Sequence, residues 1–319
     1  MKVLITGGNG YVGSVLLPRL IENEINVSNI DAQWFGNFLP DSFNQLTQIK
    51  EIDQIDENDL KDVDHVIHLA NVANDPSVEL NPSFSWEINT LDLAKLLDTC
   101  KTKSNIKSFI YASSGSVYGF SDAEKVTEEI PLIPISAYNK TKQIAERVCL
   151  SYKDYFNVHI VRPATVCGIS PRMRFDVVVN MFVLQAYRNS RITILGGEQI
   201  RPNIHISDMA TVYLHFLENY HLPSGFFNAG FENLSITKIA ERVQRISKCE
   251  FEILSSNDPR SYRLDSTKLL QTGFKPNFSV DDAIEEVYLA LKENKIKDDP
   301  RFHTVSWMKS KKIGIKNEY

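Results

Sequence analysis

The first half of the chain alternates short apolar runs with longer stretches whose apolar residues recur at helical spacing. The short runs are bounded by turn residues, a pattern typical of strands buried on both faces: Lys2–Thr6, Val27–Asp31, Val66–Ala70, Phe109–Ser114 and His159–Pro163. The helical stretches are Tyr11–Asn23, Phe84–Lys101 and Ala137–Tyr152. This alternation predicts an α/β fold in which helices cover both faces of a parallel sheet.

The pattern loosens after Pro163, which predicts a second structural unit. We expect residues 1–165 to form the main domain, with residues 204–230 returning to it. Residues 166–203 and 231–295 are predicted to form a smaller α/β lobe, with helices at Val177–Tyr187, Ile236–Ser247 and Val280–Lys292. Residues 296–319 are polar and rich in lysine, and we expect a surface tail that is partly disordered.

Composition narrows the functional class. The 319 residues are 43% hydrophobic and carry a net charge of −5, which is ordinary for a soluble globular protein and gives no support to a nucleic-acid or anionic-membrane surface. No apolar run approaches the roughly 18–20 residues that span a bilayer. A strand pattern beginning at Lys2 leaves no room for a signal peptide. The scattered cysteines and histidines predict neither disulfides nor a metal site and favour a cytoplasmic location; the cysteines are Cys100, Cys149, Cys167 and Cys249.

A glycine-rich turn lies between the first strand and the first helix. Gly7, Gly10 and Gly13 have the Gly-x-x-Gly-x-x-Gly spacing. The first glycine permits a tight turn, the second lets the backbone approach a pyrophosphate, and the third lets the helix pack on the strand. The free N–H groups of the helix N-terminus then favour that anion. The turn therefore predicts a dinucleotide-binding site.

Asp31 indicates which dinucleotide is bound. It ends the second strand, 18 residues after Gly13, where a carboxylate can accept hydrogen bonds from the adenosine ribose. It would repel a 2′-phosphate, so NAD is predicted in preference to NADP. Asp53 is a further candidate, for contact with the adenine edge.

Tyr138 and Lys142 are four residues apart at the start of a helix, which places them on one face. A tyrosine is a poor base at neutral pH, but a nearby lysine and a cationic nicotinamide favour its phenolate. It could then accept a proton from a substrate hydroxyl while a hydride leaves the same carbon. Ser114, at the end of a buried strand, is a candidate to hydrogen-bond the reacting oxygen.

Together these motifs resemble the extended short-chain dehydrogenase/reductase family, and within it the NAD-dependent nucleotide-sugar epimerases and dehydratases. The resemblance extends over nearly the whole chain and also includes His68-Leu69-Ala70, Asn89, Val117-Tyr118-Gly119, Arg162-Pro163 and Arg201…His205…Asp208. It implies a Rossmann-type, doubly wound sheet with a smaller substrate-binding lobe. It also implies that Tyr138 is the acid/base, that Lys142 activates it and binds the nicotinamide ribose, and that Ser114 orients the sugar's 4-hydroxyl.

The resemblance implies further binding residues. For the cofactor they are Tyr11, Val12, Leu69, Ala70, Asn89, Pro163 and, besides their catalytic roles, Tyr138 and Lys142; for the substrate they are Ser116, Asn180, Arg201 and Arg260. Arginines also recur after Pro163, which suggests an anionic ligand because arginine binds phosphates bidentately. Arg201 and Arg260 are the candidates for the nucleotide diphosphate, and Arg172 is a further one.

One departure from the family pattern reduces the number of reactions to be expected. Dehydratases of the family carry an Asp-Glu pair just before Val-Tyr-Gly, whereas this chain has Gly115-Ser116. A 4,6-dehydratase is therefore not expected, and oxidation at C4 followed by hydride return, which gives net 4-epimerisation, fits the remaining residues. A 4-dehydrogenase or 4-ketoreductase would use the same side chains, and a non-catalytic NAD-binding protein is a third possibility. By analogy with the family, we expect a homodimer formed through Phe84–Lys101 and Ala137–Tyr152, and a role in polysaccharide biosynthesis.

Overall fold

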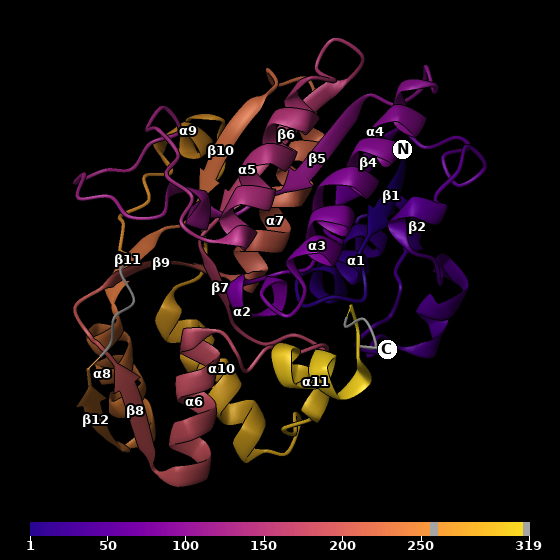
Figure 1. The fold of residues 1–319 in the computed structure, drawn as a ribbon. Coiled ribbons are helices and arrows are strands. Elements are labelled where there is room, and N and C mark those ends of the chain that lie inside the picture. Colours follow the sequence, from indigo (N-terminus) through magenta and orange to yellow (C-terminus); the bar gives the residue numbers. More distant parts are fainter. Residues whose placement is uncertain (256–260, 315–319) are drawn as a thin grey trace.

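The computed structural model describes residues 1–255 and 261–314, and its centre is a parallel sheet (Figure 1). The sheet has seven strands in the order β10-β6-β5-β4-β1-β2-β3. Their bounds are β1 Lys2–Thr6, β2 Asn26–Ile30, β3 Thr47–Gln48, β4 His65–His68, β5 Ser108–Ala112, β6 Asn157–Pro163 and β10 Gly225–Ala229. All neighbouring pairs are parallel. The predicted doubly wound α/β fold is confirmed.

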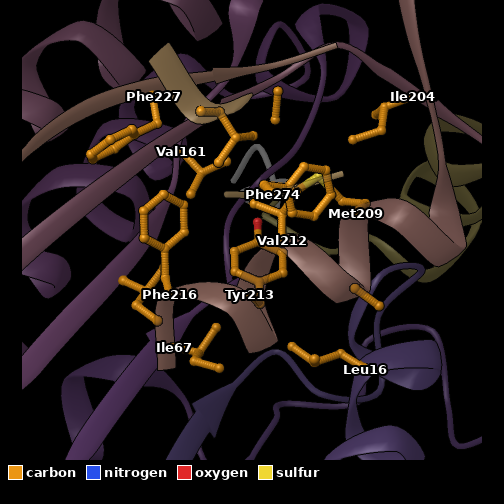
Figure 2. Packing of buried hydrophobic residues seen from close by; sticks show 14 of the residues in the cluster. Leu16, Ile67, Val161, Ile204, Met209, Val212, Tyr213, Phe216, Phe227 and Phe274 are labelled. Atoms are coloured by element: carbon orange, nitrogen blue, oxygen red, sulfur yellow. The ribbon is translucent and has the colours of Figure 1, made fainter. Parts of the chain in front are cut away.

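The two faces of the sheet bury alternate residues of each strand under different helices. Val3 and Ile5 pack in a cluster with α1 (Gly13–Glu22) and α7 (Ile206–Glu218). Leu4 packs on the opposite side with α4 (Leu93–Lys101) and α5 (Ala137–Leu150). Figure 2 shows the first cluster, in which Phe216 of α7 lies against Phe227 of β10, their ring centroids 4.8 Å apart. Because side chains alternate along a strand and helices cover both faces, the inner strands are buried along almost their whole length.

Short elements connect the strands and helices of this domain. The predicted helix Phe84–Lys101 is one helical run in which α3 (Pro82–Trp86) and α4 are joined by a π-turn, η3 (Glu87–Asp92). The remaining short elements are η1 Asp41–Leu46, η2 Ile52–Gln54, α2 Asp75–Val78 and η4 Gly115–Tyr118.

The smaller lobe has its own apolar core and lies beyond the carboxyl ends of the strands (Figure 1). Its strands form a three-stranded sheet, β11-β9-β7, and a parallel pair, β12-β8. Its elements are β7 Thr165–Cys167, α6 Val178–Asn189, β8 Arg191–Leu195, β9 Ile200–His205, β11 Glu232–Ser235, α8 Ile236–Ser247, β12 Glu250–Leu254 and α10 Val280–Lys292. One segment expected in this lobe packs elsewhere, because Leu269 of α9 (Thr267–Gln271) and Phe274 belong to the core of the main domain.

The end of the chain differs from the expected polar tail. Residues 300–311 form η5 (Pro300–Phe302) and α11 (Thr304–Lys311). Phe302 and Met308 are buried, and the indole nitrogen of Trp307 donates to the carbonyl of Trp34 at 2.7 Å. These few apolar side chains and one hydrogen bond therefore hold this lysine-rich segment against the loop that follows β2. Within the described residues, no helix has the length and apolar character needed to cross a membrane.

Candidate active site

A cavity of about 520 Å³ opens at the carboxyl ends of the strands, between the two lobes. The strand order reverses between β1 and β4, so the turns that follow these two strands diverge and leave a crevice. Its lining comes from the glycine turn, the segment after β4, the segment after β5, the start of α5, the loop between β7 and α6, and α11. A neighbouring cavity of about 120 Å³ extends beneath Asp31. The two cavities share Gly7, Gly10, Trp34, Phe35, Leu69 and Asn71.

The three glycines of the turn have distinct roles. Gly7 has φ +81°, and a Cβ there would lie 2.6 Å from the backbone nitrogen of Ala70. A Cβ on Gly13 would lie 2.4 Å from the carbonyl oxygen of Gly7, so the turn and α1 could not pack. A Cβ on Gly10 would meet only that same oxygen, at 3.2 Å, and otherwise faces open space lining the cavity. No side chain caps α1, so its N–H groups stay available to an anion.

Asp31 lies where the sequence predicts, at the smaller cavity. Its carboxylate accepts hydrogen bonds from the backbone N–H groups of Asn9 at 2.8 Å and Gln33 at 2.7 Å. Burial raises the pKa of Asp31, and these two donors oppose the rise. Asp53 is exposed and lines neither cavity; Glu51 and Ile52 lie at the smaller cavity instead.

Asn71 is a cavity residue that sequence reasoning missed. It lines both cavities, and its side-chain oxygen and nitrogen are buried with no partner among the described residues. Buried polar atoms are normally paired, so this amide has the character of a ligand-binding group. The only signal in the sequence was its place directly after Leu69 and Ala70 at the end of β4. With Gly10 and Asp31, it makes the cavity fit a dinucleotide.

Tyr138, Ser114 and Lys142 meet at the other end of the larger cavity. Tyr138 and Ser114 both line it, and the Ser114 side chain is near enough to Tyr138 to affect its pKa. Lys142 lies one turn further along α5, where its Nζ donates to the carbonyl of Ala112 at 2.7 Å. Nζ is 5.9 Å from the centre of the Tyr138 ring. The structure therefore brings Lys142 close to Tyr138, although Lys142 itself lines neither cavity.

Burial shifts the pKa of both groups on α5 away from its usual value. Desolvation raises the pKa of Tyr138 to about 12, and the nearby Ser114 side chain acts in the opposite direction. Desolvation lowers the pKa of Lys142 to about 7, and the negative charge of Glu146 opposes this. In both cases burial favours the neutral form of the side chain, because a low-dielectric site disfavours charge.

Two of the other predicted substrate residues line the cavity, and one does not. Arg201 and Ser116 line the cavity, and the Ser116 Oγ lies 2.8 Å from that of Ser114. Asn180 does not line it: its amide nitrogen donates to the Tyr11 hydroxyl at 2.9 Å, and its oxygen accepts from the backbone of Gly168 at 3.0 Å. Asn180 therefore ties the smaller lobe to the glycine turn. Arg260 lies outside the described residues.

Five more of the predicted cofactor residues line a cavity, and Asn89 does not. Tyr11, Val12, Leu69 and Pro163 line the larger cavity, and Ala70 lines the smaller one. Asn89 lines neither; its amide brackets Val72, accepting from the backbone N–H at 2.8 Å and donating to the carbonyl at 3.1 Å. It shapes the segment after β4 rather than facing the cavity.

Comparison with known proteins decides the family. A family model described as "NAD dependent epimerase/dehydratase family" matches residues 3–230. The chain belongs to the NAD-dependent epimerase/dehydratase family. Its cofactor is accordingly NAD, as the sequence predicts.

Three members of this family illustrate its range of reactions. The chain is 31% identical to YtcB of Bacillus subtilis, described as an uncharacterized UDP-glucose epimerase, over 77% of this chain and 82% of that one. It is 28% identical to UDP-glucuronic acid decarboxylase 4 of Arabidopsis thaliana, over 88% and 66% of the two chains. The structure of UDP-glucuronic acid 4-epimerase from Bacillus cereus, in complex with UDP-glucuronic acid and NAD, matches with a TM-score of 0.81 and 27% identity, over 92% and 100%.

Among the residues that the structure describes, no three or more His, Cys, Asp or Glu side chains are grouped so that they could hold a metal ion. The site brings together hydroxyl, amide, carboxylate and guanidinium groups from separate segments of the chain.

Gly10→Ala separates cofactor binding from folding. The added methyl group would meet the protein only at the Gly7 carbonyl oxygen, 3.2 Å away, but it enters the space at the glycine turn. We therefore expect binding of NAD⁺ to weaken roughly tenfold, the equivalent of about 1.4 kcal/mol of steric cost. Calorimetric titration of cofactor-free protein measures the affinity, and thermal melting of the same sample should show little change. Gly13→Ala is the contrasting variant, which we expect to lower the melting temperature. Equal affinity of Gly10→Ala and wild type would contradict this account of the turn.

The lowered pKa of Lys142 predicts a pH-dependent stability. Between pH 7 and 9 an unfolded lysine, with a pKa near ~10.4, keeps a proton that the folded protein has released. The unfolding free energy of cofactor-free protein should therefore rise with pH relative to that of Lys142→Met, by up to about 1.4 kcal/mol per pH unit. Urea unfolding of both proteins at the two pH values measures this difference. Parallel pH dependences would show that Lys142 stays protonated.

Proposed function

We propose that the protein is a nucleotide-sugar 4-epimerase that oxidises the sugar at C4 and returns the hydride to the opposite face. The observation that carries the proposal is that Tyr138 and Ser114 line the same cavity as the glycine turn. This places an acid/base and a hydroxyl-orienting group within one cavity that also accommodates a dinucleotide.

The side chains support both halves of such a cycle. In the oxidation, Tyr138 accepts the proton of the C4 hydroxyl, which Ser114 orients by a hydrogen bond. Bound NAD⁺ supplies the hydride acceptor and, after the keto-sugar has rotated, the hydride donor. In the return step Tyr138 gives its proton back to the C4 oxygen, so protons and electrons balance over the cycle. The raised pKa of Tyr138 favours the protonated form that the return step requires, and the positive charge of bound NAD⁺ would favour the phenolate that begins the oxidation.

The lining of the cavity supports a phosphorylated sugar as the substrate. Three arginines line it, Arg172, Arg174 and Arg201, although the whole chain is acidic. Arg174 is paired with Asp176 through two hydrogen bonds of 2.9 and 3.1 Å. UDP-glucose and UDP-glucuronic acid, named in the descriptions of the relatives, are the first substrates to test. The product would be a precursor for polysaccharide synthesis. We also propose a cytoplasmic location, where the free, buried cysteines would stay reduced.

A decarboxylase is the second candidate, because a relative of that description matches most of the chain. It would begin with the same oxidation at C4, so Tyr138 and Ser114 would serve both reactions. The products separate them: an epimer has the mass of the substrate, whereas decarboxylation of UDP-glucuronic acid releases CO₂. A 4-dehydrogenase or 4-ketoreductase would instead consume or require free dinucleotide in every turnover.

Tyr138→Phe tests the proposal with the two UDP-sugars and product analysis by NMR and mass spectrometry. We expect the variant to lose roughly 10²–10⁴-fold in kcat, as removal of an acid/base group does, while it keeps its NAD. Tyr187→Phe is the control, because that residue lies on α6 outside the cavity lining and is 40% exposed. A substrate deuterated at C4 should give a product that retains the label. Full activity in Tyr138→Phe would exclude this chemistry, and loss of label to the solvent or to free dinucleotide would exclude epimerisation.

We further propose that the chain forms a homodimer through the helical face on one side of the sheet. Figure 1 shows α4 and α5 on the same side of the sheet. Leu91 of η3 is 59% exposed and Ile144 of α5 is 40% exposed. Apolar side chains exposed on adjacent helices are typical of a symmetric interface.

Light scattering at micromolar concentration tests the dimer, and we expect twice the chain mass. The double variant Leu91→Asp, Ile144→Asp places two charges on this face and should reduce the mass to that of one chain. Leu195→Asp is the matched control, since Leu195 is also 59% exposed but lies on β8 of the smaller lobe. A monomeric wild type, or a dimer that survives the double substitution, would exclude this interface.

A further inference from the structure

Arg172 is a buried cation whose hydrogen-bonding capacity is only partly used. It lies between β7 and α6, is 3% exposed and lines the larger cavity. Its guanidinium carbon stacks 4.0 Å from the centre of the Phe35 ring, and its Nη2 donates to the Thr304 hydroxyl at 3.3 Å. Its Nε has no partner among the described residues. The guanidinium group is thus held firmly while one of its donors remains unused.

The carboxylates nearest to Arg172 are already engaged by other groups. Asp176 holds Arg174 through two hydrogen bonds and also accepts one from the Asn74 amide at 3.1 Å. Asp31 accepts two backbone N–H groups. Within residues 1–255 and 261–314, no ion pair of Arg172 is found. Burial lowers the pKa of Arg172 to about 9, so the group is still charged at neutral pH, and a buried charge without a counter-ion is costly.

The loop that carries Arg172 is fastened to the glycine turn. The hydroxyl of Ser170 donates to the carbonyl of Tyr11 at 2.7 Å, and its oxygen lies 2.8 Å from that of Ser14 at the start of α1. The backbone N–H of Arg172 also donates to Ser14 at 3.4 Å. These contacts place Arg172 opposite the uncapped end of α1, the end that receives the pyrophosphate in dinucleotide-binding folds.

We propose that Arg172 binds the NAD pyrophosphate from the side of the smaller lobe, opposite the glycine turn. This differs from the role suggested by sequence, in which Arg172 holds the nucleotide diphosphate of the substrate. A forked guanidinium matches phosphate oxygens, and the pyrophosphate would supply the counter-ion that the protein does not. Because Arg172 belongs to the smaller lobe, the contact would join the two lobes through the cofactor and slow its release. The inference rests on NAD as cofactor and not on which sugar reaction follows.

Calorimetric titration of cofactor-free protein with NAD⁺ and, separately, with UDP tests the assignment. In Arg172→Met we expect NAD⁺ to bind roughly 10–100-fold more weakly, as loss of charge-assisted hydrogen bonds predicts, and UDP to bind as in wild type. Arg301→Met is the matched control: its guanidinium also stacks on a phenylalanine of the loop after β2, at 4.1 Å from the Phe38 ring, but it does not line the cavity. It should bind both ligands as wild type does.

Two other results of these titrations would contradict the proposal. Weaker binding of UDP with unchanged NAD⁺ would assign Arg172 to the substrate, and unchanged binding of both would leave it a purely structural residue; either overturns the proposal. If Arg172→Met does not fold, Arg172→Lys decides, because an ammonium keeps the charge but not the forked geometry. We expect several-fold weaker NAD⁺ binding in that variant, and wild-type affinity would overturn the inference. Since no sugar is turned over, this result is independent of whether the protein is an epimerase.

Discussion

The position of the active site depends on a buried ion pair between Glu146 of α5 and Arg162 of β6. Two hydrogen bonds of 2.8 and 2.7 Å join them, and their side chains are 1% and 3% exposed. Glu146 also accepts from the Ser113 hydroxyl at 2.5 Å, and Arg162 donates to the Tyr118 hydroxyl at 2.7 Å. Loss of one partner from such a pair costs about 3–5 kcal/mol, because the other charge stays buried. The pair thus fixes the catalytic helix relative to both the strand and the turn that carry the remaining site residues.

This arrangement explains how Tyr138 and Ser114 can meet without further support. Glu146 lies one turn beyond Lys142 on α5, and Ser113 immediately precedes Ser114. Both functional elements are therefore anchored to the same carboxylate, so their separation is set by covalent geometry and one buried hydrogen-bond network. A network of this kind holds a catalytic geometry more narrowly than surface loops do. Burial also favours the neutral form of Tyr138, the proposed acid/base.

Local sequence patterns predicted the parts of the molecule that are built from consecutive residues. The sheet, the glycine turn and the spacing of Tyr138 and Lys142 each depend on a short periodic motif, and each appears in the structure. Asp53 was misplaced because the 3₁₀ turn η2 (Ile52–Gln54) leaves its side chain exposed while Glu51 and Ile52 line the smaller cavity. Asn180 does not line the cavity, because its polar side chain is buried in a contact between the lobes. Such errors arise where a side chain's role is decided by residues distant in sequence.

Helix α11 is a further element that the sequence did not predict, and it contributes to the cavity. Nothing in a lysine-rich segment predicts that Thr304, Val305 and Met308 line the cavity. They do so because Phe302 enters the core of the smaller lobe and Trp307 is hydrogen-bonded to the loop after β2. The cavity is therefore walled by the main domain, the smaller lobe and α11 together. An enzyme that returns the hydride it has removed gains from such a wall, because the reduced cofactor and the keto-sugar must both stay bound until the second transfer. A dehydrogenase that exchanges its cofactor in every turnover would have to open the same wall each time.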